Sequence, residues 1–235
     1  MIQSPSMISP IHGLARKLGA QFVEIAGWQV PQVYQTVEEE VATARHGLAL
    51  ADASSSGKIV VEGAPSAAVL QVTWAMPATN IGQGVIGASG RLYRLRKEQF
   101  FIHIPAGQEQ DVTRRLIEVT QETGEKVTVT DITHGRADLL LVGPSSPVLL
   151  SRLCGVDFHP GQFPDLTAKQ STVAKTRQLI LRRDMGDTPA YSLIGARSLA
   201  AYLWGTILEA GSDLDIGPIG QAALERLQQD NRSRA

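Results

Sequence analysis

The sequence predicts an α+β fold made of two pseudo-repeated halves, each built from βαβ units. Three observations predict it: an internal repeat at one constant offset, strand-like apolar runs that lead into helices, and the composition of a globular protein. The chain has 235 residues, of which 43% are hydrophobic and 19% are charged. A chain of this length can bury one large core or the cores of two closely packed halves.

Six pairs of residues recur along the chain at an offset of 79 positions. The pairs are Asp52 and Asp131, Ser54 and Thr133, Pro65 and Pro144, Ser66 and Ser145, Val69 and Val148, and Leu70 and Leu149. Because the paired residues sit in similar local patterns, a duplication is the economical interpretation. We therefore predict a single domain, 1–235, that is internally duplicated over about 50–125 and about 128–212.

The residues ahead of the first half, 10–47, predict a helical lead-in. Residues 11–17 carry apolar side chains at helical spacing, and 36–46 begins acidic and ends basic, as the helix dipole favours. Between these helices, the run 27–34 holds a tryptophan, a proline and a tyrosine. Large rings around a proline indicate a fixed corner rather than a loose loop.

Each half contains two strand–helix units. Runs 58–61 and 138–141 are predicted strands, and each is followed by a glycine, then Pro–Ser and an apolar helical stretch. Proline in a first helical turn loses no hydrogen bond. The second unit starts with strands 100–104 and 191–194, each leading into a predicted helix. A C-terminal helix is expected over 218–228.

Composition and charge exclude several classes of function. A net charge of −1 and a pI near 6.5 give no reason to expect nucleic acid or an anionic membrane as a partner. The runs 38–40 and 182–183 are interpreted as solvated charged faces. The chain lacks an apolar run of 18 residues, so no membrane span is expected. Its one cysteine, Cys154, is interpreted as a buried structural thiol in a reducing compartment, which predicts a cytoplasmic protein.

Two common motifs are rejected. Residues 82–87 match the dinucleotide fingerprint GxGxxG, but a turn and an alternating strand-like run, 91–95, follow where that fingerprint needs a helix. We predict a turn that continues through 88–90 and a strand over 91–95. The five histidines are scattered without a metal-ligand spacing, so no metal site is predicted.

A spaced series of motifs resembles a known family. The chain reads GWxxPxxY over 27–34 and RxGLxxxDxS over 45–54, and residues 131–133, 143–144 and 220–227 match later blocks. Together they are similar to the glycine-cleavage T-protein family of tetrahydrofolate-dependent aminomethyltransferases. The second half also resembles the γ subunit of heterotetrameric sarcosine oxidase.

The resemblance implies a fold, a cofactor and a partner. The fold would be two ferredoxin-like βαβ halves of the aminomethyltransferase folate-binding type. The sequence ends soon after Arg226, so we expect it to lack the C-terminal β-barrel domain of the family. The implied cofactor is tetrahydrofolate, and the sarcosine oxidase resemblance implies a flavoprotein partner subunit.

One departure from the family concerns catalysis. A Gly-Gly-Val-Ile-Asp-Asp block supplies the family with a carboxylate for the folate amine, but here both acidic positions have become Gly87 and Ala88. No Asp or Glu occurs anywhere from 63 to 97. General acid/base catalysis, which contributes ~10²–10⁴-fold, has no local source. No catalytic residue is therefore assigned.

The resemblance also implies four ligand-binding residues. Arg226 would pair with the glutamate carboxylate of a folate and Asp187 would accept from the pterin, while Tyr93 and, more weakly, Tyr191 would line the slot for its ring. The ordinary interpretations are a surface arginine for Arg226, a turn residue for Asp187 and a strand residue for Tyr93.

Two functions therefore stand side by side. The first is an aminomethyltransferase-like tetrahydrofolate-binding protein of one-carbon metabolism, without standard T-protein catalysis because the family's aspartate is missing. The alternative is a non-catalytic subunit or scaffold of a flavin-dependent, sarcosine-oxidase-like complex. A metabolite sensor that uses the inherited pocket is a third interpretation.

Overall fold

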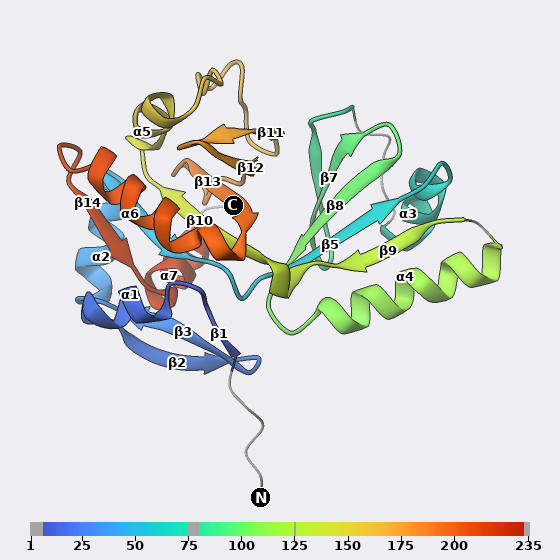
Figure 1. Ribbon diagram of the computed structural model, residues 1–235, viewed down its shortest axis with the longest axis horizontal. Coiled ribbons are helices and arrows are strands. Elements are labelled where there is room, and N and C mark those ends of the chain that lie inside the picture. Colours follow the sequence, from blue (N-terminus) through green and yellow to red (C-terminus); the bar gives the residue numbers. More distant parts are fainter. Residues whose placement is uncertain (1–6, 75–79, 125, 233–235) are drawn as a thin grey trace, which may run out of the picture.

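A computed structural model of the chain describes residues 7–74, 80–124 and 126–232. Two large β-sheets form two lobes, and a smaller sheet lies beside one of them (Figure 1). The first large sheet has the strand order β6-β7-β8-β5-β9. Its strands are β5 (Gly57–Glu62), β6 (Gly84–Gly87), β7 (Gly90–Arg96), β8 (Gln99–Ile104) and β9 (Thr128–Asp131).

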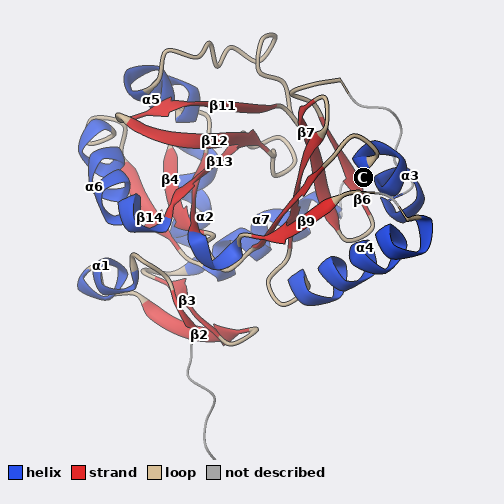
Figure 2. Ribbon diagram, turned by 45° about the vertical axis from the view of Figure 1, so that its right-hand side comes forward, coloured by secondary structure: helices blue, strands red, loops and turns tan. Residues whose placement is uncertain are grey.

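Two helices cover one face of this first sheet, as Figure 2 shows on its right-hand side. They are α3 (Ser66–Trp74) and α4 (Glu109–Thr123). Alternate residues of β5 point to the helices: Ile59 and Val61 pack with Leu70 and Leu116, whereas Val60 faces the other sheet. This period of two is what a strand buried on both faces requires.

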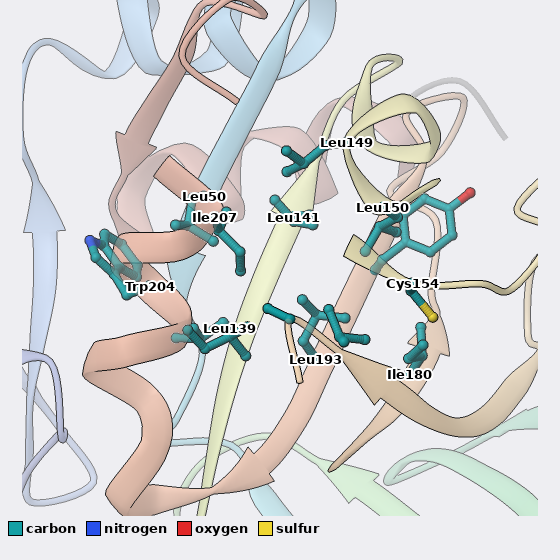
Figure 3. Close-up of a cluster of buried hydrophobic side chains, with 14 of the residues drawn as sticks. Leu50, Leu139, Leu141, Leu149, Leu150, Cys154, Ile180, Leu193, Trp204 and Ile207 are labelled. Atoms are coloured by element: carbon teal, nitrogen blue, oxygen red, sulfur yellow. The ribbon is translucent and has the colours of Figure 1, made fainter. Parts of the chain in front are cut away.

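The second large sheet has the order β11-β12-β13-β10-β4-β14. Its strands are β4 (Leu48–Asp52), β10 (Arg136–Val142), β11 (Ala168–Val173), β12 (Thr176–Arg182), β13 (Ala190–Ala196) and β14 (Ile216–Ile219). Helices α5 (Ser146–Leu153) and α6 (Ala200–Ala210) pack on one face, where Leu141, Leu193 and Trp204 lie in one apolar cluster (Figure 3). The buried Cys154 belongs to this cluster, as its apolar surroundings predict.

The remaining elements close the other face and the flanks. Helices α2 (Val37–His46) and α7 (Gln221–Arg232) pack against β4 and β10. Short 3-10 turns, η1 (Thr133–Gly135) and η2 (Arg197–Leu199), precede β10 and α6. No described helix is long and apolar enough to cross a membrane.

The two large sheets repeat the same strand order and exchange one strand each. β6-β7-β8-β5 of the first sheet corresponds to β11-β12-β13-β10 of the second, and helices α3 and α4 correspond to α5 and α6. The strand β4, which precedes β5 in the chain, pairs with β10 in the other sheet. In the same way β9, which precedes β10, pairs with β5. The predicted repeat thus falls on equivalent elements that interlock.

Hydrogen bonds at the crossing of the two exchanged strands are reciprocal. The carboxylate of Asp52 accepts from the Ser54 backbone N–H at 3.0 Å, and Asp131 accepts from the Thr133 N–H at 2.9 Å. The Ser54 hydroxyl oxygen then accepts from the Asp138 N–H (3.1 Å), while that of Thr133 accepts from the Lys58 N–H (2.9 Å). Each half therefore satisfies a buried donor of the other.

The N-terminal lead-in contains the two expected helices, α1 (His12–Lys17) and α2, and also a sheet that the sequence did not predict. Strands β1 (Met7–Ile8), β2 (Gln21–Ile25) and β3 (Trp28–Val33) form it in the order β1-β3-β2. The tryptophan–proline corner is thus part of strand β3. Trp28 and Val30 are buried from the same face of that strand, which is the alternation of a half-buried strand.

Glu40 corrects the interpretation of the acidic run 38–40 as a solvated face. Its side chain is only 2% exposed. One carboxylate oxygen accepts from the backbone N–H groups of Tyr34 (2.5 Å) and Gln35 (3.0 Å), and the other accepts from Gly220 (2.7 Å). A buried carboxylate is tolerated when backbone donors surround it in this way. Glu40 ties the lead-in to the start of α7.

Residues 82–87 form no dinucleotide-binding turn. Strand β6 pairs antiparallel with β7 through Gly84–Tyr93 and Gly87–Gly90. The predicted strand over 91–95 lies in β7, directly after the turn at 88–89. The helix predicted over 218–228 is observed as α7, which starts at Gln221 and continues to Arg232.

The crossing yields a stability prediction. Ser54→Ala and Thr133→Val each leave one buried backbone N–H without an acceptor, which costs about 1–3 kcal/mol in the free energy of unfolding. Urea denaturation measures this loss. Ser151→Ala, which removes an exposed hydroxyl on α5, is the control and should change stability by less than about 0.5 kcal/mol. Equal stability of all three variants would contradict the proposed importance of the crossing.

Candidate functional site

A cleft of about 580 Å³ lies where the two large sheets meet, on the side of α7. We call it the central cleft. Its lining combines residues 86–91 of the β6–β7 hairpin, the end of β8 and the residues after it, the segment 183–186 after β12, and α7. The volume is within the range of small-molecule sites, about 300–1,000 Å³.

Beneath the cleft lies a buried pair of opposite charges, Lys58 and Asp138. They occupy equivalent positions at the starts of β5 and β10, and neither side chain is exposed. The Lys58 ammonium donates to the carbonyl oxygens of Ser54 (3.1 Å) and Ser56 (2.6 Å). Burial lowers the pKa of Lys58 to about 8, although Asp138 and Asp52 oppose the shift. Lys58 therefore holds its proton mainly through these carbonyl groups and carboxylates.

His103 connects this buried pair to the cleft. The His103 Nε2 lies 2.9 Å from the Asp138 carboxylate, and the same residue lines the cleft. Burial lowers the pKa of His103 to about 4, and the hydrogen bond with Asp138 only partly offsets it. Burial alone would raise the pKa of Asp138, but His103, Arg183 and Lys58 hold it below its ordinary value. At neutral pH the imidazole is thus neutral and donates its Nε2 proton to an ionised Asp138.

Two arginines line the cleft. Arg183 is only 6% exposed, and its Nε donates to the Ser192 hydroxyl at 2.7 Å, which in turn donates to Asp138 at 3.2 Å. Burial lowers the pKa of Arg183, while Asp138 opposes the shift. The Nε of Arg91 is buried without a hydrogen-bond partner among the described residues. The cleft therefore presents positive charge and unused donors to a ligand.

The basic run 182–183 is not a solvated face, contrary to the sequence interpretation. Arg182 is 8% exposed, and its guanidinium holds Asp184 with contacts of 2.9 Å (Nε–Oδ1) and 2.8 Å (Nη2–Oδ2). Asp184 is the one carboxylate among the described residues that line the central cleft. Because Arg182 neutralises it, Asp184 can accept hydrogen bonds from a ligand without making the cleft anionic.

The segment in which Gly87 and Ala88 stand at the acidic positions of the family lies at this cleft. Gly87, Ala88 and Ser89 all belong to the lining. A Cβ atom at Gly87 would come within 2.0 Å of the Trp74 indole nitrogen, so a side chain there needs Trp74 to move. The indole thus fills space that an aspartate at position 87 would need.

The four residues predicted from the resemblance are not brought together at the cleft. Tyr93 is fully buried between the sheets and its hydroxyl donates to the Arg182 carbonyl oxygen at 3.3 Å. Tyr191 is fully buried against Phe158, at 5.9 Å between ring centroids. None of the four is part of the described lining of the cleft.

The other two predicted residues are exposed. Asp187 lies in the turn that Met185 and Thr188 close by a β-bridge, next to the cleft-lining Gly186. Arg226 lies on α7, where its side chain is 64% exposed and contacts Asp230 at 3.2 Å. Their roles as ligand contacts stay predictions.

Sequence reasoning missed the residues that do line or support the cleft: Lys58, Arg91, His103, Asp138, Arg183 and Asp184. The sequence does mark three of these residues as unusual. Lys58, His103 and Asp138 are polar residues inside otherwise apolar strand runs, and a buried polar residue needs a partner or a function. Arg183 gave no such signal, because its burial follows only from the packing of the two sheets.

The chain belongs to the family described as the GCVT N-terminal domain, which matches residues 11–234. An aminomethyltransferase of Halothermothrix orenii is 26% identical over 232 residues, covering 94% of this chain and 64% of the relative. Sarcosine oxidase subunit alpha of Rhizobium meliloti is 26% identical over 249 residues, covering 95% of this chain and 25% of the relative. The chain thus spans less than two thirds of these relatives.

Solved structures show the same fold. The glycine cleavage system aminomethyltransferase T of Bartonella henselae superposes with a TM-score of 0.81 at 23% identity, over 96% of this chain and 62% of that chain. A chain of the heterotetrameric sarcosine oxidase of Corynebacterium sp. U-96 gives a TM-score of 0.68 at 17% identity, over 89% of this chain and 96% of that one. The predicted aminomethyltransferase type of fold and the resemblance to both groups are confirmed.

The buried His103 makes stability depend on pH. Its pKa in the folded protein, about 4, lies below the ordinary value of 6.5, so the unfolded chain binds a proton in this window that the folded chain does not. The free energy of unfolding should therefore fall as the pH drops from 6.5 to 4, by up to about 3 kcal/mol more in the wild type than in His103→Gln. Urea denaturation at a series of pH values measures the difference.

The control for this experiment is His46→Gln, which removes an imidazole at an exposed position at the end of α2. The unfolding free energies of wild type and His46→Gln should change together on acidification. Parallel pH profiles for wild type and His103→Gln would contradict the assignment of a neutral, buried His103. The groups that face this imidazole are Asp138, Arg183 and Lys58.

Proposed function

We propose that the chain is an aminomethyltransferase-like protein that binds a tetrahydrofolate-type ligand in the central cleft. The observation that carries the proposal is the meeting of two cleft-lining segments, 86–91 and 183–186. The first corresponds by resemblance to the acid block that contacts folate in the family. The family membership supports a folate, because its aminomethyltransferases are folate-dependent.

The charges of the cleft suit such a ligand. A folate carries carboxylates at one end and a flat ring with a polar edge at the other. Arg183 and Arg91 supply guanidinium groups for the carboxylates, and the lining also holds Gln108 and Gln221 as amide partners. Asp184 supplies an acceptor for the N–H groups of the ring edge. These cleft residues are proposed in addition to the four that the family resemblance implies. Of those four, Arg226 is the one that a ligand titration tests best.

Standard aminomethyl transfer is not part of the proposal. The hairpin 86–91 brings no carboxylate to the cleft, and the nearest one in the lining, Asp184, is tied to Arg182 by two contacts. This carboxylate is thus already engaged within the protein. Ligand binding, rather than catalysis, is the activity that the arrangement supports.

A non-catalytic subunit of a flavin-dependent, sarcosine-oxidase-like complex is the second candidate function. Its support is the similarity of fold to a chain of a heterotetrameric sarcosine oxidase, of which this chain covers 96%. An exposed apolar side chain in the lining of the central cleft also favours a partner: Ile86 is 66% exposed. Isolated exposed apolar residues are common, so co-purification with an FAD-containing protein is the decisive observation for this role.

Calorimetric titration with 5-formyltetrahydrofolate tests the first proposal. We expect saturable binding to the wild type, and affinities lower by about tenfold or more in Arg91→Gln and Arg183→Gln, because each removes a charge-assisted hydrogen bond. Arg16→Gln, an exposed arginine on α1 outside the lining, is the matched control. Unfolding curves of each variant establish that it is folded.

Two results distinguish the versions of the proposal. Lack of saturable binding to the wild type at millimolar ligand would overturn it. A loss of affinity in Arg226→Ala supports the resemblance-based role of that residue, whereas an unchanged affinity removes Arg226 from the site and leaves the central cleft in place.

A further inference from the structure

A second cleft, of about 620 Å³, opens where the two large sheets meet at their other end. Arg96, Arg136 and Arg177 lie in its lining, and no Asp or Glu is found among the described residues there. We call it the basic cleft. Its volume is similar to that of the central cleft, and the function proposed above leaves it unused.

The three arginines have no counter-ion in the part of the chain that the structure describes. Other arginines of the protein, such as Arg152 and Arg182, form ion pairs with aspartates. The side chains of Arg96, Arg136 and Arg177 take part in no ion pair or hydrogen bond among the described residues. In a protein with a net charge of −1, three unpaired guanidinium groups around one cavity form a local anion-attracting field.

The β-sheet register brings two of these arginines to one row. Arg136 on β10 pairs with Ala196 on β13, and one residue along, Gln178 on β12 pairs with Gly195 of the same strand. Arg177 is therefore level with Arg136, two strands away, which is about 10 Å between backbones. Arg96 comes from the β7–β8 hairpin of the other sheet. Side chains of arginine length can converge on one ligand across this distance.

One amide in the lining has an unused acceptor. The Oε1 of Gln99 is buried without a hydrogen-bond partner among the described residues, whereas its Nε2 donates to the Glu62 carboxylate at 2.5 Å. Because a carboxylate can only accept, the amide nitrogen must face Glu62. This fixes the amide orientation and leaves the carbonyl oxygen free.

The position of that amide is set by the strand. Gln99 lies two residues before Phe101 on β8, so both side chains point to the same face of the sheet, the one that meets the other sheet. A buried carbonyl oxygen without a donor costs about 1–3 kcal/mol. The acceptor therefore calls for a ligand that carries a hydrogen-bond donor.

We propose that the basic cleft binds a small organic anion that carries carboxylate or phosphate groups together with a hydroxyl or amino donor. The arginines hold the anionic groups, and the amide oxygen of Gln99 accepts from the donor. The apolar side chains of Phe101 and Leu179 in the lining contact the body of the molecule. This site is separate from the central cleft and independent of the folate proposal.

Isothermal titration with 5-hydroxyisophthalate, which has two carboxylates, a ring and a hydroxyl donor, tests the proposal. We expect one saturable site in the full chain, with affinity lower by about tenfold or more in Arg136→Gln and in Arg177→Gln. Arg114→Gln is the control, because Arg114 is exposed on α4 and pairs with Asp111 away from this cleft. The dimethyl ester, which has no charge, should not bind.

A second comparison tests whether the ligand needs a hydrogen-bond donor. Wild type should bind 5-hydroxyisophthalate more tightly than isophthalate, by about fivefold or more for one hydrogen bond, and Gln99→Met should lose this preference. Saturating 5-formyltetrahydrofolate should leave the titration unchanged. Absence of saturable binding at millimolar probe, wild-type affinity in both arginine variants, or competition with the folate would overturn the proposal.

Discussion

The exchange of strands between the two halves is the constraint on which the rest of the structure depends. β4 and β9 each leave their own half and pair in the other sheet, so the chain passes twice through one buried crossing. Backbone N–H groups cannot remain unpaired there. The hydroxyls of Ser54 and Thr133 satisfy them reciprocally. Because the crossing fixes both sheets against each other, it also fixes the two clefts at their junction.

The same crossing explains why charged side chains lie in the core. Lys58 and Asp138 stand at equivalent positions of the repeat, and the strands that carry them are buried on both faces. An isolated buried charge is strongly unfavourable. Here the carbonyl groups of the crossing surround Lys58, and His103 and Ser192 surround Asp138. This network reaches the lining of the central cleft through Arg183. The charges beneath the cleft therefore come from the repeated strands. The acidic hairpin of the family does not contribute to them, because this chain lacks its carboxylates.

Local patterns in the sequence predicted the fold to a large extent. The offset of 79 marked equivalent elements, the dipole-matched run 36–46 contains helix α2, and the alternating run 91–95 lies in strand β7. The hairpin of β2 and β3 was missed because Trp28 and Pro31 suggested a corner, whereas pairing with β1 and β2 makes this segment a strand. The candidate site was predicted less well. Arg183 and Glu40 belong to charge runs that look solvated, and only contacts between distant segments bury them.

The central claim is that the central cleft, at the junction of the two sheets, is the folate-type binding site. Hydrogen–deuterium exchange with and without 5-formyltetrahydrofolate tests it most directly, because it reports the contacted backbone without any substitution. The account predicts slower exchange in residues 86–91, 103–108 and 183–186, which line the cleft from both sheets, and unchanged exchange in β1, α5 and α6. Protection confined to other segments, or no change at saturating ligand, would contradict it.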